Sequence, residues 1–303
     1  MKKKLPFTGL CTALVTPFLP DGDRAPDLDA LYRLIEFQIA GGADALLILG
    51  TTGEAATVRD DEREIILRRA VESVRGRVPV VAGCGSNSTP TAVRYARQAE
   101  EAGCDAVLCV TPYYNKATKE GLVRHFEAVA DACPLPVILY NVPSRTGVDI
   151  PMAVYEKLVA HPSVAGVKEA SGDIRRAGAL CAAFGEDLAV YAGNDAEFVP
   201  VCALGGKGAF SVASNLFPAP LSLLCRRMRD GKTEEAARIQ RALCPLADAL
   251  FSEVNPVPVK AACAMTGLCS DAVRLPLTEL SPALREPLSR AAEGFRKAVE
   301  AGL

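Results

Sequence analysis

Lys168 follows an apolar run, residues 164–167, and could act as an amine nucleophile. If this run is a strand, it carries the ammonium group into or beside the interior of the fold, where burial disfavours the charged form. A neutral amine attacks a ketone to form an imine, which accepts electrons from the adjacent carbon and yields an enamine. A lone strand-end lysine more commonly extends to solvent or pairs with a neighbouring carboxylate, here Glu169.

Tyr140 favours the catalytic interpretation of Lys168. Side chains alternate along a strand, so Ile138 and Tyr140 share one face, as Gly166 and Lys168 do on the next predicted strand. A phenol that faces the amine can move protons on and off the carbinol oxygen, and Gly166 leaves room for it. The alternative for Tyr140 is a packed aromatic ring with a hydrogen-bonded hydroxyl.

Two further strand ends carry groups that suit carboxylate binding. Thr51 and Thr52 lie between two glycines in Gly-Thr-Thr-Gly-Glu, residues 50–54, which can aim backbone N–H groups and hydroxyls at a carboxylate. Arg145 follows the strand that ends at Tyr140 and can hold a second carboxylate by two parallel hydrogen bonds. Most loop arginines are merely solvated, so neither signal decides alone.

The elements that position these residues alternate regularly up to about residue 230. Amphipathic stretches such as 60–75, 90–103, 119–133 and 173–184 separate short apolar segments, which indicates a parallel sheet with helical crossovers. The eight predicted strands are residues 10–16, 45–49, 78–82, 106–110, 136–140, 164–168, 188–192 and 208–212. They predict an α/β fold, a (β/α)8 TIM barrel with its reactive groups where strands end. An open doubly wound sheet is the alternative, but Gly-x-Gly-x-x-Gly is missing.

After residue 216 the chain reads as helical, at 219–229, 233–252 and 281–301, with a proline-containing turn at 253–258. The sequence therefore predicts a catalytic barrel over residues 1–230 and a C-terminal helical appendage over residues 231–303.

Charge and hydropathy exclude several classes of function. The formal net charge is -2, and the only lysine run is Lys2–Lys4, so we expect no nucleic-acid partner. That run and the apolar residues 10–19 imitate a signal peptide, but Thr12, Thr16 and Pro17 interrupt them and no cleavage site follows. No apolar run is long enough to cross a bilayer, so we expect no membrane partner and a cytoplasmic location.

The chain has eleven cysteines but no Cys-x-x-Cys pair, and its two histidines are isolated. This pattern indicates reduced thiols in the core rather than a metal site. We expect neither metal nor cofactor.

Four motifs, at residues 50–54, 111–115, 140–147 and 167–170, closely resemble those of the dihydrodipicolinate synthase family. The resemblance runs in one order from residues 7–9 through 205–208 to 255–260. It implies that Lys168 forms an imine with pyruvate, that Tyr140 shuttles protons, and that Thr52 helps to hold the pyruvate carboxylate. It also implies that Thr51 links Tyr140 to Tyr114, which a neighbouring subunit provides in a homotetramer built as a dimer of dimers.

The same resemblance implies that Arg145 binds the carboxylate of L-aspartate 4-semialdehyde. The enamine attacks its aldehyde, and its amine then displaces Lys168, which gives 4-hydroxy-tetrahydrodipicolinate on the way to diaminopimelate and lysine. The resemblance also implies that Gly193 and the backbone of Phe210 line the pocket, although Phe210 replaces the smaller aliphatic residue expected there.

The residues at the position of the family's lysine-inhibition site differ from those of lysine-inhibited members. Lysine-inhibited members resemble one another in a glutamate and a histidine at a subunit interface, where this chain has Thr91 and Arg63, although Tyr113 and Asn87 remain. Without a carboxylate, the ammonium group of bound lysine stays unpaired, so we expect weak or absent feedback.

Two alternatives remain. N-acetylneuraminate lyase and the 2-keto-3-deoxy sugar-acid aldolases share the lysine and the tyrosine, but Arg145 suits a short amino aldehyde acid better than a polyhydroxylated chain. The second alternative is a barrel protein without catalytic activity. Such a protein is expected to have lost some of the catalytic residues, whereas all of them are present here.

Overall fold

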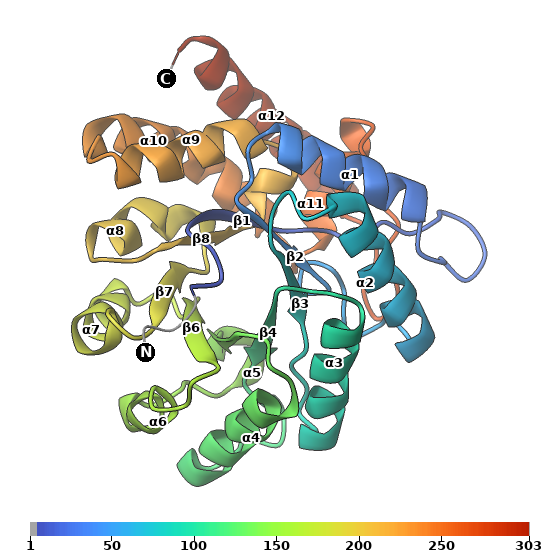
Figure 1. The fold of residues 1–303 in the computed structure, drawn as a ribbon. Helices are drawn as coiled ribbons and strands as arrows, with labels where there is room; N and C mark the ends of the chain where they lie inside the picture. Colours follow the sequence, from blue (N-terminus) through green and yellow to red (C-terminus); the bar gives the residue numbers. More distant parts are fainter. Residues whose placement is uncertain (1–4, 303) are drawn as a thin grey trace.

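The computed structural model describes residues 5–302, so the Lys2–Lys4 run lies outside the described residues. Eight parallel strands close into a barrel in which each strand pairs with its neighbours in sequence and β8 pairs with β1 (Figure 1). The strands are β1 (Gly9–Ala13), β2 (Ala45–Ile48), β3 (Val80–Gly83), β4 (Ala106–Val110), β5 (Val137–Asn141), β6 (Val164–Glu169), β7 (Ala189–Ala192) and β8 (Gly208–Ser211). The predicted TIM barrel is confirmed.

Helices surround the barrel, and capping residues fix where several of them begin. The side chains of Asp27 and Thr118 each accept a hydrogen bond from a backbone N–H in the first turn of the helix that follows, the usual role of Asp and Thr at this position. These outer helices are α1 (Leu28–Ala40), α2 (Asp60–Val74), α3 (Thr89–Glu101), α4 (Lys119–Ala132), α5 (Pro143–Thr146), α6 (Met152–Leu158), α7 (Ile174–Phe184), α8 (Phe198–Ala203) and α9 (Pro218–Arg229).

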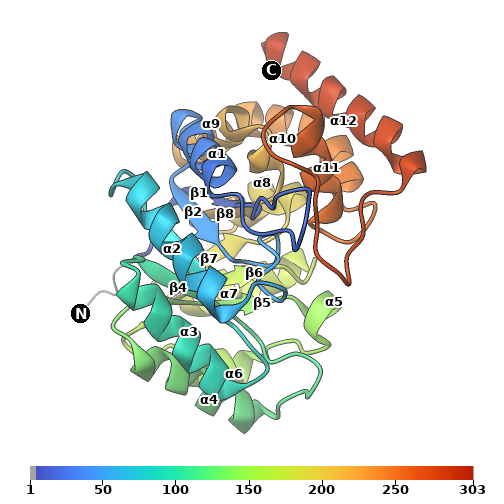
Figure 2. The same cartoon turned by 90° about the vertical axis from the view of Figure 1, so that its right-hand side faces the viewer.

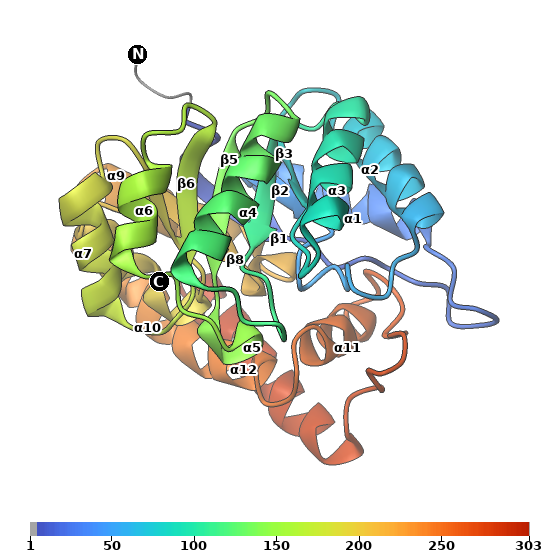
Figure 3. The ribbon, with the colours of Figure 1, turned by 90° about the horizontal axis from the view of Figure 1, so that it is seen from below.

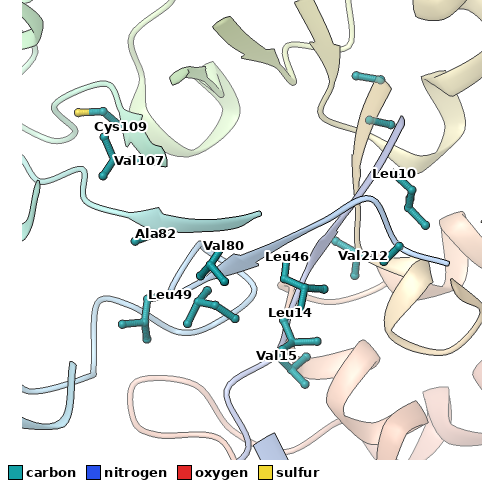
Figure 4. Packing of buried hydrophobic residues seen from close by; sticks show 14 of the residues in the cluster. Leu10, Leu14, Val15, Leu46, Leu49, Val80, Ala82, Val107, Cys109 and Val212 are labelled. Carbon is teal, nitrogen blue, oxygen red and sulfur yellow. The ribbon is translucent and has the colours of Figure 1, made fainter. Parts of the chain in front are cut away.

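Alternation along the strands divides the core into two layers. Side chains such as Leu46, Val80 and Val107 point outward and pack under the helices; Figure 4 shows part of this layer around β1 and β2. Side chains of the opposite phase, such as Leu47 and Leu108, fill the lumen. Tyr140 belongs to the lumen layer, so the strand alternation directs it inward as the sequence predicted.

Three helices follow the barrel: α10 (Thr233–Leu250), α11 (Val257–Met265) and α12 (Pro282–Glu300). Helix α10 packs against α9 and α12. Helix α11, which the sequence analysis did not delimit, lies at the same end of the barrel as α5, where the strands finish (Figures 2 and 3). The helical C-terminal region is confirmed, whereas the division into two units at residue 230 stays a prediction.

Buried charges connect this region to the loop after β2. The ammonium group of Lys260 in α11 is fully buried, forms an ion pair with Glu54 and donates to the carbonyl of Ala272 at 2.7 Å. Burial lowers the pKa of Lys260, and the carboxylate of Glu54 opposes that shift. Because Glu54 ends the Gly-Thr-Thr-Gly-Glu motif, this pair fixes the loop that carries Thr51 and Thr52.

Within residues 5–302, no helix combines the length and the apolar character needed to span a membrane. The same residues contain no group of three or more His, Cys, Asp or Glu side chains placed to hold a metal ion.

Candidate active site

Lys168 and Tyr140 lie side by side at the carboxyl ends of β6 and β5. They are register partners across the two strands, and the lysine Nζ atom lies 4.3 Å from the centre of the tyrosine ring. Each residue is only 6% exposed. The amine and the phenol therefore share one enclosed space, as the alternation of side chains predicted.

Glu169 is engaged elsewhere, which removes the alternative in which it pairs with Lys168. Its carboxylate accepts hydrogen bonds from Arg176 Nε at 3.0 Å and from the backbone N–H of Ser171 at 2.7 Å. It also accepts from the side-chain amide of Asn141. None of the ion pairs between residues of the 5–302 segment includes Lys168.

The surroundings of the amine are largely apolar. The ring of Phe210 lies 5.1 Å from the Nζ atom of Lys168 and packs edge-on against Phe7 and Tyr191. Burial raises the pKa of the Cys11 thiol, also in the lumen, well above its usual value, so this thiol stays neutral. The large ring of Phe210, flagged in the sequence as a departure, thus fills part of the lumen beside the amine.

Asp195, which the sequence analysis missed, is a buried carboxylate at the carboxyl end of the barrel. It accepts hydrogen bonds from Ser211 Oγ at 2.5 Å and from the backbone N–H groups of Val212 and Ala213. Burial raises the pKa of Asp195, while these hydrogen bonds and the charge of Lys168 oppose the rise. Its place just after β7, at the catalytic end of the barrel, was the available sequence signal.

A cavity of about 450 Å³, within the range of small-molecule sites, opens beside Tyr140. Thr51, Tyr140 and Arg145 form part of its wall. Arg145 lies in α5 and is exposed, and its Nη2 atom donates to the carbonyl of Asn255 at 3.2 Å. No ion pair in the described chain includes Arg145, so its guanidinium group remains able to bind a carboxylate.

Asn255 was also missed, since the sequence predicted only a turn there. Its side-chain amide donates to the hydroxyl of Thr52 at 3.0 Å, and its carbonyl accepts from Arg145. It thereby joins the loop after β2 to the loop after β5.

Other predicted site residues lie outside the cavity wall. Thr52 is buried, and Gly193 donates from its N–H to the carbonyl of Glu169 at 2.7 Å. A Cβ atom on Gly193 would lie 2.5 Å from that of Ala170, so only glycine fits there. Tyr114 points away, 90% exposed, on the loop after β4. The residues that the structure does not place on the wall are Lys168, Thr52, Tyr114, Gly193 and Phe210.

The fold and this site define a (β/α)8 barrel with a buried lysine and tyrosine where β5 and β6 end, an arrangement suited to imine chemistry. A model of the Dihydrodipicolinate synthetase family matches residues 6–294, and the chain belongs to that family.

Individual relatives span almost the whole chain. The 4-hydroxy-tetrahydrodipicolinate synthase of Pseudomonas aeruginosa is 46% identical over 94% of this chain and 97% of its own length. The structure of the enzyme of that name from Methylacidiphilum fumariolicum SolV is 41% identical, with a TM-score of 0.93 over 97% of each chain. The structure of dihydrodipicolinate synthase from Acinetobacter baumannii complexed with pyruvate has a TM-score of 0.93 at 39% identity, over 95% of this chain and 99% of that one.

Proposed function

We propose that this protein is a lyase that condenses pyruvate with L-aspartate 4-semialdehyde to give 4-hydroxy-tetrahydrodipicolinate, in the biosynthesis of diaminopimelate and lysine. The observation that carries the proposal is the enclosed pair of Lys168 and Tyr140 beside a cavity on which Arg145 opens. Relatives named for this activity, at 42–46% identity over most of the chain, support it.

The reaction begins at the amine of Lys168, which attacks the keto carbon of pyruvate. Tyr140 delivers a proton to the carbinol oxygen, water leaves, and a cationic imine forms. Loss of a proton from the pyruvate methyl group gives the enamine. Asp195, a buried carboxylate whose pKa burial raises and the charge of Lys168 lowers, favours cationic states of this nitrogen whenever it is ionised.

The second half-reaction uses the cation of Arg145. It holds the carboxylate of the semialdehyde while the enamine carbon attacks the aldehyde, and a new carbon–carbon bond forms. The amine of the semialdehyde then displaces Lys168 from the imine carbon and closes the ring. The free lysine is regenerated, and one water molecule is released for each pair of substrates.

Thr51 and Thr52 have supporting roles in this proposal. Thr51 relays protons between Tyr140 and the Tyr114 of a neighbouring subunit, and Thr52 helps to hold the pyruvate carboxylate. The exposure of Tyr114 supports such an exchange between subunits, and we infer a homotetramer built as a dimer of dimers. Gly193 and the backbone of Phe210 complete the pyruvate pocket, and the enzyme acts in the cytoplasm without a metal or cofactor.

A coupled assay with both substrates, run with and without lysine, tests this function. We expect turnover of pyruvate with the semialdehyde, and little change with millimolar lysine because Thr91 and Arg63 provide no carboxylate for its side-chain ammonium group. The alternative, a sugar-acid lyase, predicts that cleavage of N-acetylneuraminate exceeds the condensation. Strong inhibition by lysine would contradict the regulatory part alone.

A further inference from the structure

The strand that carries Lys168 contains one extra residue before its catalytic end. The register pairs Val164 and Gly166 of β6 with consecutive residues of β5, so Ala165 is an additional residue between the two pairs. Such a bulge reverses the phase of the side chains that follow it. Val164 packs in the outer layer of the core, and simple alternation from there would turn Lys168 outward as well. The bulge therefore accounts for the inward direction of the Lys168 side chain.

The shifted register continues to the ends of both strands, where a polar pair forms across them. Tyr140 and Lys168 are register partners, and the next pair along the strands is Asn141 with Glu169. Alternation turns this second pair to the outer side of the barrel. The side-chain amide of Asn141 donates to both carboxylate oxygens of Glu169, at 3.2 and 3.0 Å. In the register without the bulge, Asn141 would lie opposite Lys168, so this contact depends on the shift.

Arg176 of α7 holds Glu169 from the side of the helices. Its Nε atom donates to Glu169 at 3.0 Å and its Nη1 atom to Asp149 at 3.1 Å, while its other terminal nitrogen donates to the carbonyl of Ile150. Asn141 is tied to the same two residues, since its amide donates to Asp149 at 2.7 Å and its carbonyl accepts from the N–H of Ile150 at 3.0 Å. Asn141 and Glu169 are buried and the side chain of Arg176 is 15% exposed, so solvent ions screen these contacts little.

We propose that Asn141, Glu169 and Arg176, here called the outer clamp, are positioning residues for the imine-forming amine, an inference that rests on the proposed function. The outer clamp acts through the strands rather than on the reacting atoms. It holds the ends of β5 and β6 in the shifted register, which keeps the amine of Lys168 in the lumen, 4.3 Å from the centre of the Tyr140 ring. Loss of the outer clamp displaces the amine, and a displacement of about 1 Å can slow a reaction by about 100-fold.

A double variant without unpaired charge separates positioning from stability. Glu169→Leu/Arg176→Met replaces the ion pair with apolar side chains, an exchange that often leaves stability unchanged. Thermal unfolding measures stability, and quenching with borohydride at successive times measures imine formation at saturating pyruvate. We expect a Tm near that of the wild type but a rate constant for imine formation lower by about 10- to 100-fold. Arg176→Lys, which keeps the cation, should lie between the two, and Arg175→Met, at an exposed neighbour, should match the wild type.

Hydrogen exchange provides a second readout that needs no substrate. In the double variant, the amides of residues 137–141 and 164–170 should exchange faster than in the wild type, while those of residues 45–48 and 80–83 keep their rates. A variant that is only less stable would exchange faster throughout the barrel. If the double variant fails to fold, Asn141→Leu, which retains the ion pair of Glu169 with Arg176, decides by the same two measurements.

The proposal is overturned if a folded variant of the outer clamp forms the imine at the wild-type rate. It is equally overturned if the rate falls only in variants that also lose stability, or if exchange rises alike in all strands. Failure of the wild type to form any imine with pyruvate would instead refute the proposed function, and hydrogen exchange would still decide whether the outer clamp holds the two strands.

Discussion

The amine of Lys168 lies 4.3 Å from the centre of the Tyr140 ring, on residues that are register partners across β6 and β5. Both side chains point into the lumen, where aromatic rings and a neutral thiol surround them. Because the strands fix this arrangement, the amine and the phenol are positioned before any substrate arrives. Most of the predictions below concern what this pair and its supports do.

Replacement of Tyr140 by phenylalanine should slow the reaction by about 10²- to 10⁴-fold in kcat, because the proton relay at the carbinol oxygen is lost. The ring remains beside Lys168, so packing is preserved. Tyr155→Phe is the matched control, since Tyr155 is a buried tyrosine of α6 that does not line the cavity. Steady-state kinetics measure the effect, and an unchanged kcat in Tyr140→Phe would remove the tyrosine from the mechanism.

Replacement of Arg145 by alanine should reduce kcat/KM for the semialdehyde by about 10- to 100-fold, the loss expected for a charge-assisted hydrogen-bonded contact. Imine formation with pyruvate should remain near the wild-type rate. Arg175→Ala is the control, at an exposed arginine of α7 that pairs with Asp173. A parallel loss of imine formation would instead indicate that Arg145 supports the fold of the site.

Replacement of Lys260 by methionine should destabilise the protein by about 3–5 kcal/mol, because the buried carboxylate of Glu54 loses its cation. The double variant Lys260→Met/Glu54→Gln should recover much of this stability, since it leaves no unpaired buried charge. Thermal and denaturant unfolding measure both. Equal destabilisation of the single and double variants would show that the pair does not act as a unit.

His125 should make the protein less stable in acid. Its Nδ1 atom lies 2.9 Å from the hydroxyl of Thr89, and burial lowers its pKa from 6.5 to about 4. Between pH 6.5 and pH 4 the unfolded chain binds a proton at this ring that the folded chain does not, so the free energy of unfolding falls as the pH falls. The loss should approach about 2–3 kcal/mol near pH 4.5 and level off below the folded pKa.

Replacement of His125 by glutamine tests this acid sensitivity. The variant should show a shallower loss of stability between pH 7 and pH 4.5 than the wild type, whatever its stability at neutral pH. His161→Gln is the control, since His161 is the other histidine and is more exposed. Identical pH slopes for the wild type and His125→Gln would contradict the assignment.

Much of the fold could be predicted because the signals are local. The apolar segments place all eight strands, and their alternation turns Tyr140 and Lys168 toward each other. The ends of the strands were predicted less accurately. Strand β1 stops at Ala13 rather than at residue 16, because the backbone N–H of Val15 donates to the side chain of Asn215 instead of to a neighbouring strand.

The contacts that complete the site depend on residues remote in sequence. Asn255 donates a hydrogen bond to Thr52, which lies 203 positions away in the sequence, and no local sequence pattern predicts that contact. Tertiary packing therefore supplied what spacing and residue type could not.

The most direct test of the central claim is reduction with borohydride in the presence of pyruvate, followed by peptide mass spectrometry. The account predicts a three-carbon adduct on Lys168, absent without pyruvate and absent from Lys168→Ala, whereas Lys207→Ala still forms it. An adduct on another lysine, or none in wild-type protein that is folded and supplied with pyruvate, would contradict it.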